Sequence, residues 1–174
     1  MTFLKKQAFG FWLSLLSIIA VVAGYVIYSQ AIVAGDGLVI ASGSQPFYES
    51  DTDIYMTMVS TVQSMFLLTL ACIVASVVFS QGLRESVGGL YKVLEFVVGA
   101  LRVVIPVLLM ILVLNFLYGS FTGLGWTFFS NEELKIYPEA VAVGTNVITA
   151  IGLFAGALVL SLFGSFFNVT KKAE

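Results

Sequence analysis

Residues 9–28 read FGFWLSLLSIIAVVAGYVIY, an uncharged and predominantly apolar run. About 20 such residues in a helix cross the roughly 30 Å hydrocarbon layer of a bilayer. The run is longer than the apolar part of a secretory signal, so we expect an uncleaved first transmembrane helix rather than a leader peptide. This stretch indicates that lipid, not water, is the solvent in which the protein folds.

Three further apolar runs follow, at residues 55–79, 103–118 and 140–167. Of the 174 residues, 59% are hydrophobic and only 10% are charged, whereas about a quarter of the residues in soluble domains are charged. Four spans use about 80 residues and leave room for connections and overhanging helix ends. The sequence therefore predicts an all-α integral membrane protein, with a single domain over residues 1–174 built as a four-transmembrane-helix bundle.

Basic residues are distributed unequally among the segments outside these runs. Seven of the eight basic residues lie at the two chain ends or in the segment 81–102. The segments 32–53 and 119–139 contain one basic residue between them, Lys135, and are rich in Asp and Glu. Cytoplasmic segments are enriched in Lys and Arg. We therefore expect the N- and C-termini and residues 81–102 in the cytoplasm, and the other two segments as outer loops. This arrangement requires an even number of spans, and we expect a prokaryotic plasma membrane.

The segment 81–102 carries Arg84, Lys92, Glu95 and Arg102 at spacings near multiples of the helical repeat. This pattern favours an amphipathic helix in the cytoplasmic interface, which turns into the membrane near Pro106. The alternative is one long, tilted third helix. In that arrangement Arg102 begins inside the hydrocarbon edge, extends its side chain toward the headgroups and pairs with Glu95.

The second apolar run is the most polar of the four, with Ser60, Gln63 and Ser64 near its start. Polar groups persist in hydrocarbon where they meet another helix or water. Two interpretations therefore stay open, namely interhelical hydrogen bonds and a hydrophilic path across the membrane. Acidic outer loops would concentrate cations at the mouth of such a path, although a depletion of Lys and Arg alone also leaves acidic loops.

The fourth run contains a Gly-xxx-Gly step formed by Gly152 and Gly156, preceded by Thr145, Asn146 and Thr149. Small residues on one stripe of a membrane helix let a second helix approach closely. The stripe therefore predicts a helix-packing face. Its partner is either another helix of the same bundle or another subunit.

Several chemistries lack the residues that they need. The chain has no histidine and one cysteine, which leaves no basis for a His/Cys metal site or a Ser-His-Asp triad. No span has a central carboxylate of the kind that ion-coupled transporters use, and no glycine-rich phosphate motif occurs. The few basic residues flank the spans and do not form a nucleic-acid surface. We expect no enzymatic activity, no cofactor, no metal and no nucleic-acid partner.

By elimination, the sequence favours a non-catalytic interaction or accessory subunit of a larger membrane protein complex. Its partners would be other integral membrane subunits and the lipid bilayer. The alternative is a small homo-oligomeric channel or transporter, in which Gln63 lines the pore and the acidic outer mouth prefers cations.

Overall fold

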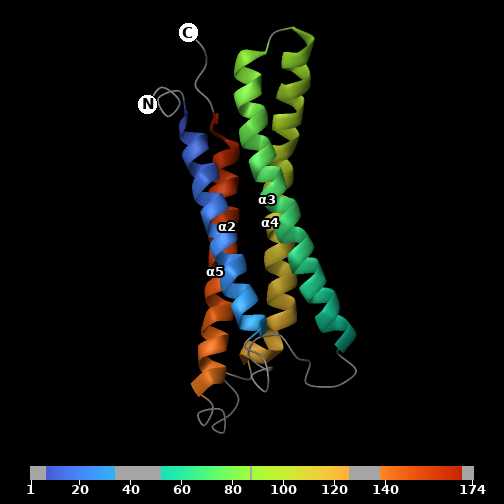
Figure 1. Cartoon of the computed structure of the whole chain (residues 1–174), viewed down its shortest axis with the longest axis vertical. Helices are drawn as coiled ribbons and strands as arrows, with labels where there is room; N and C mark the ends of the chain where they lie inside the picture. The colour runs from blue at the N-terminus through green and yellow to red at the C-terminus, as the bar shows by residue number, and fades with distance from the viewer. Residues whose placement is uncertain (1–6, 34–51, 87, 126–137, 170–174) are drawn as a thin grey trace.

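The described part of the chain folds into four long helices. The computed structural model describes residues 7–33, 52–86, 88–125 and 138–169. The helices are α2 (Phe9–Val33), α3 (Thr52–Glu85), α4 (Gly89–Gly125) and α5 (Pro138–Ser165). They lie side by side along one long axis (Figure 1). Each contains a stretch that is long and apolar enough to cross a membrane, so the predicted all-helical, multi-pass membrane protein is confirmed at this level.

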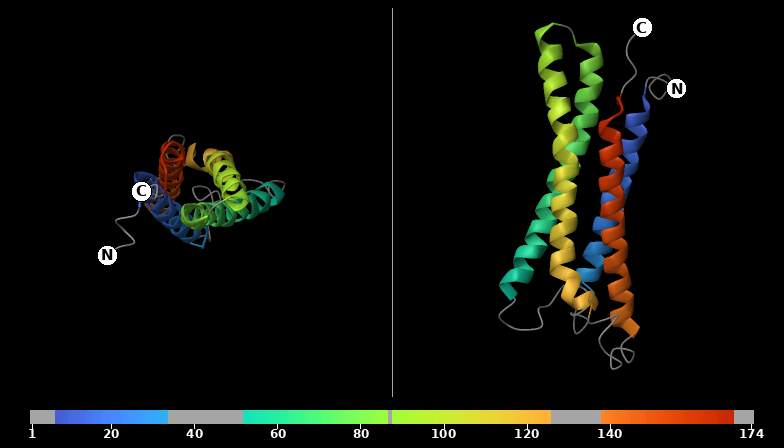
Figure 2. Two further views of the ribbon diagram at one scale, coloured as in Figure 1. Left: turned by 90° about the horizontal axis from the view of Figure 1, so that it is seen from above. Right: turned by 180° about the vertical axis from the view of Figure 1, so that it is seen from behind.

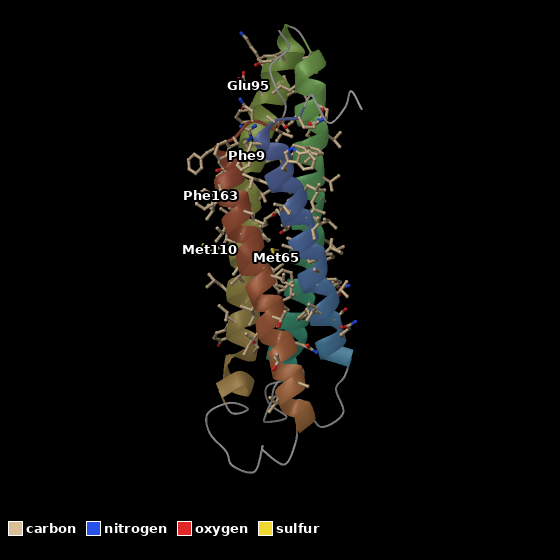
Figure 3. All side chains as sticks on the ribbon, turned by 90° about the vertical axis from the view of Figure 1, so that its left-hand side faces the viewer. Phe9, Met65, Glu95, Met110 and Phe163 are labelled. Carbon is tan, nitrogen blue, oxygen red and sulfur yellow. The ribbon has the colours of Figure 1, made fainter. Side chains whose placement is uncertain are left out.

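Two of the helices, α3 and α4, extend well beyond the predicted spans. α3 has 34 residues and α4 has 37, so each measures roughly 50 Å or more at about 1.5 Å per residue. The hydrocarbon layer is only about 30 Å thick. One end of the α3–α4 pair projects past the ends of α2 and α5 (Figures 1 and 2), and Figure 3 places Glu95 beyond Phe9 along the long axis. Helical hydrogen bonding thus continues where the apolar pattern stops.

α4 continues as one helix through Pro106. Residues 89–102 therefore belong to the same helix as the predicted third span. Proline lacks the N–H that would donate to the carbonyl four residues earlier, here that of Arg102, and membrane helices tolerate this loss. The level of residues 89–102 relative to the lipid headgroups stays a prediction.

The start of α2 and the end of α5 lie together, at the same end of the bundle as the connection between α3 and α4 (Figures 1 and 2). Ala8 N–H donates to the Val169 carbonyl at 3.0 Å, and Gly10 N–H donates to the Asn168 carbonyl at 3.1 Å. A Cβ at position 10 would lie 2.6 Å from the Asn168 carbonyl oxygen, so this clasp requires glycine. The shared end agrees with an even number of spans, while its cytoplasmic location stays a prediction.

At the same end of the bundle, a pair of glutamines joins α3 to the residues just before α2. Gln81 Nε2 donates to Gln7 Oε1 at 2.8 Å, and Gln7 Nε2 donates back to Gln81 Oε1 at 3.4 Å. Just before α4, Gly88 has a φ of 68°, a left-handed conformation that glycine adopts without strain. The reversal between α3 and α4 is therefore compact.

The core is organised by two antiparallel pairs, α2 with α5 and α3 with α4, which α4 and α5 join together. Aromatic rings connect all four helices. Phe66 of α3 stacks on Tyr25 of α2 at 3.9 Å between ring centroids. Tyr28 of α2 meets Phe116 of α4 edge-on at 4.7 Å, and Phe116 lies 6.2 Å from Phe154 of α5. Such contacts supply packing energy that does not depend on water.

Apolar side chains also cover the outside of the bundle. Leu16 of α2, Val78 of α3, Val103 of α4 and Phe163 of α5 are each at least half exposed. Contiguous exposed apolar surface on this scale is unfavourable in water. It is what hydrocarbon-facing helices require, because the lipid tails are as apolar as the side chains.

Candidate functional site

The polar face predicted on the second span turns away from the bundle. Ser60, Gln63 and Ser64 are all exposed on α3. Among the described residues, the Gln63 carboxamide has no hydrogen-bond partner. These three residues therefore do not line a path inside a single four-helix bundle. They face either lipid or another protein chain.

The predicted packing stripe of α5 also faces outward. Apart from the two chain neighbours and the backbone of α5 itself, no atom of the described residues lies within 4 Å of a Cβ built on Gly152 or Gly156. Thr145, Asn146 and Thr149 are exposed. The two threonine hydroxyls donate to carbonyls of their own helix at 2.7 and 2.8 Å, whereas the Asn146 carboxamide has no partner in the described part of the chain.

Close packing of α5 on α2 uses different glycines. A Cβ on Gly24 would lie 3.0 Å from Cε1 of the Phe154 ring and 3.3 Å from Cβ of Leu153. Gly10 is tighter still, as described above. The close approach of α2 to α5 thus uses Gly24, and Gly10 packs against the residues that follow α5. A partner for Gly152 and Gly156 is not found within the described residues.

The predicted interface charges separate into two groups. Lys92 and Glu95 are exposed on the projecting part of α4. The side chain of Arg84, in α3, lies outside the described residues. Arg102 is half-buried, and no ion pair joins it to Glu95 or to another described residue.

Arg102 instead lines a cleft to which all four helices contribute. The cleft is small, with a cavity volume of about 30 Å³, and it is partly open to the exterior. Among the described residues, its polar lining consists of Arg102 and five serines, which are Ser14 and Ser17 of α2, Ser76 of α3, and Ser161 and Ser165 of α5. None of these described lining residues is a carboxylate. The cleft is therefore polar and, at Arg102, positively charged.

Four of the five serine hydroxyls already donate to helix carbonyls, and these include Ser161 Oγ to Leu158 at 2.8 Å and Ser165 Oγ to Leu162 at 2.6 Å. Arg102 Nε is buried and has no partner among the described residues. Ser17 Oγ donates across to the Ala157 carbonyl of α5 at 3.3 Å, and Ser14 Oγ donates to the Gly10 carbonyl at 2.9 Å. A serine hydroxyl that donates one bond can still accept, and it can rotate to donate elsewhere.

The sequence analysis missed these serines. The signal was their spacing, because positions 14 and 17, and likewise positions 161 and 165, share a face of their helix. What the spacing does not give is that these two faces meet Arg102. No protein family, curated protein or solved structure matches this chain.

Proposed function

We propose that this protein is a non-catalytic accessory subunit of a larger membrane protein complex, bound to other integral membrane chains through the outward faces of α5 and α3. One observation carries the proposal. Gly152 and Gly156 have open space beside their backbone, whereas Gly24 is packed against α5 and Gly10 against the backbone that follows α5. A helix of another chain that approached α5 closely would fill this space, as small-xxx-small faces allow.

Two carboxamides support the same assignment. Gln63 on α3 and Asn146 on α5 are exposed and lack partners among the described residues. Asn115 of α4 differs, because its Nδ2 donates to the Ile111 carbonyl of its own helix at 3.0 Å. An amide without partners is unfavourable in hydrocarbon. A neighbouring subunit would supply the missing bonds, each worth about 0.6–2 kcal/mol in a membrane.

We further propose that the protein resides in a prokaryotic plasma membrane with its two ends in the cytoplasm. The distribution of basic residues supports this orientation. Alkaline phosphatase, which is active only outside the cytoplasm, should be inactive when fused after Lys172 and active when fused after Lys135. The reverse pattern would contradict the orientation.

Native mass spectrometry tests the accessory-subunit proposal, using protein purified gently in detergent from its own host. We expect stoichiometric foreign membrane chains to accompany it. A pure homo-oligomer would contradict the proposal. That result would favour the channel alternative, in which Ser60, Gln63 and Ser64, being outside the single bundle, line a pore between copies.

A further inference from the structure

We propose that the cleft around Arg102 binds the phosphate of an anionic phospholipid, taken from the leaflet at the end of the bundle where α2 begins. The cleft is separate from the outward faces of α5 and α3. The inference therefore does not rest on the accessory-subunit proposal, and either can fail without the other.

Arg102 places a positive charge inside the apolar stretch Gly89–Tyr118 of α4. Its Nε is buried without a partner among the described residues, and the part of the cleft lining that the structure describes holds no carboxylate. A guanidinium inside a membrane segment is unfavourable unless an anion or water meets it. Its planar fork of donors matches phosphate oxygens in geometry as well as in charge.

Serine hydroxyls line the cleft beside Arg102. Ser17, Ser76 and Ser161 come from three different helices and line the same cleft as Arg102. Phosphate oxygens are strong acceptors, and rotatable hydroxyls can donate to them without any change in the backbone. In the same turn of α4, Pro106 leaves the Arg102 carbonyl without its helical donor.

The depth of the cleft favours a lipid over a free ion. Ser14 lies about 8 Å along α2 from Phe9, at about 1.5 Å per residue. This is within reach of the headgroup layer for a long arginine side chain, which extends toward lipid phosphates. Apolar residues next to the cleft residues in sequence are strongly exposed, with Val103 at 66%, Phe163 at 60% and Phe166 at 84%. They offer a surface for the acyl chains of the same lipid.

The experiment uses the purified full-length protein, delipidated in detergent and titrated with three probes. The probes are phosphatidylglycerol, phosphatidylcholine and inorganic phosphate. Native mass spectrometry reports bound lipid, and the thermal unfolding midpoint reports stabilisation. We expect phosphatidylglycerol to bind and to raise the midpoint, phosphatidylcholine to do so less, and inorganic phosphate to leave the midpoint unchanged.

Two variants of α4 locate the site. Arg102→Gln should weaken phosphatidylglycerol binding about tenfold, since it removes the charge and the donor fork. Lys92→Gln is the matched control, because it removes an exposed cation from the same helix outside the cleft, and it should bind lipid like the unmodified protein. If Arg102→Gln does not fold, Ser76→Asp serves instead. Its carboxylate would compete with the phosphate for Arg102 inside the cleft and should also weaken binding.

Three results would overturn the proposal. Equal stabilisation by phosphatidylcholine would mean that only apolar lipid contacts matter. Equal stabilisation by inorganic phosphate would assign the site to a free anion. Unchanged phosphatidylglycerol binding by a folded Arg102→Gln or Ser76→Asp variant would remove the cleft from lipid recognition and leave it as a hydrated pocket.

Discussion

The two faces of α5 use small residues in opposite ways. Toward α2, buried Phe154 contacts Gly24, and buried Ala157 accepts the Ser17 hydrogen bond. Away from the bundle, Gly152 and Gly156 have no neighbour within 4 Å of a Cβ position in the described part of the chain. Lipid solvates apolar surface as well as protein does, so close packing and polar contacts decide which face is used. The inner face completes the fold, and we propose that the outer face packs against another chain.

Among the substitutions that test this comparison, Gly10→Ala is expected to have the largest effect on stability. Its Cβ would lie 2.6 Å from the Asn168 carbonyl oxygen and 2.7 Å from that of Phe167, and backbone atoms cannot give way as a flexible side chain can. We expect a loss of about 2 kcal/mol in stability, within the range for overpacked sites. The free energy of unfolding in detergent, followed by circular dichroism, measures it.

Gly99→Ala is the matched control for this change. Gly99 lies in α4 with nothing within 4 Å of its Cβ position, so alanine there should be neutral or slightly stabilising through its helix propensity. Equal destabilisation by the two substitutions would show that the close backbone contacts at Gly10 do not set the cost.

A smaller effect, on assembly and not on folding, is expected from Gln63→Leu. If the exposed carboxamide bonds to a partner chain, its loss should weaken association about 3- to 30-fold, which corresponds to about 0.6–2 kcal/mol. Asn115→Leu removes a carboxamide that its own helix already satisfies, and it should leave association unchanged. Fluorescence energy transfer in liposomes, between the labelled protein and a labelled partner chain, measures association for both variants. An unaltered affinity for Gln63→Leu would assign the α3 face to lipid contact.

The four helices could be predicted because hydrocarbon imposes a simple requirement on each segment, about 20 apolar residues with every backbone group bonded internally. Their true lengths could not. α3 begins at Thr52 and ends at Glu85, past both edges of its apolar run, because helical bonding continues wherever nothing interrupts it. Pro106 was expected to mark a turn into the membrane if residues 81–102 formed a separate interfacial helix, yet it lies inside a continuous α4, since a membrane helix tolerates one missing donor.

The candidate sites were less predictable, for a related reason. In a helix that is apolar on every side, periodicity does not reveal which face turns inward. Gly24 and Gly152 read alike in the sequence, although one is packed and the other faces open space. Arg102 was recognised as unusual from its position alone. Its surroundings of serines depend on the pairing of α2 with α5, which is a tertiary property.

The most direct test of the outer α5 face compares Gly152→Leu with Gly99→Leu in the natural host. Both add a large side chain in open space, so both variants should insert and keep the circular dichroism spectrum and unfolding midpoint of the unmodified protein. Native mass spectrometry should then find the partner chains retained by Gly99→Leu and lost from Gly152→Leu, because leucine prevents close approach at the Gly-xxx-Gly step. Retention of the same partners by a folded Gly152→Leu variant would contradict the assignment of this face to subunit assembly.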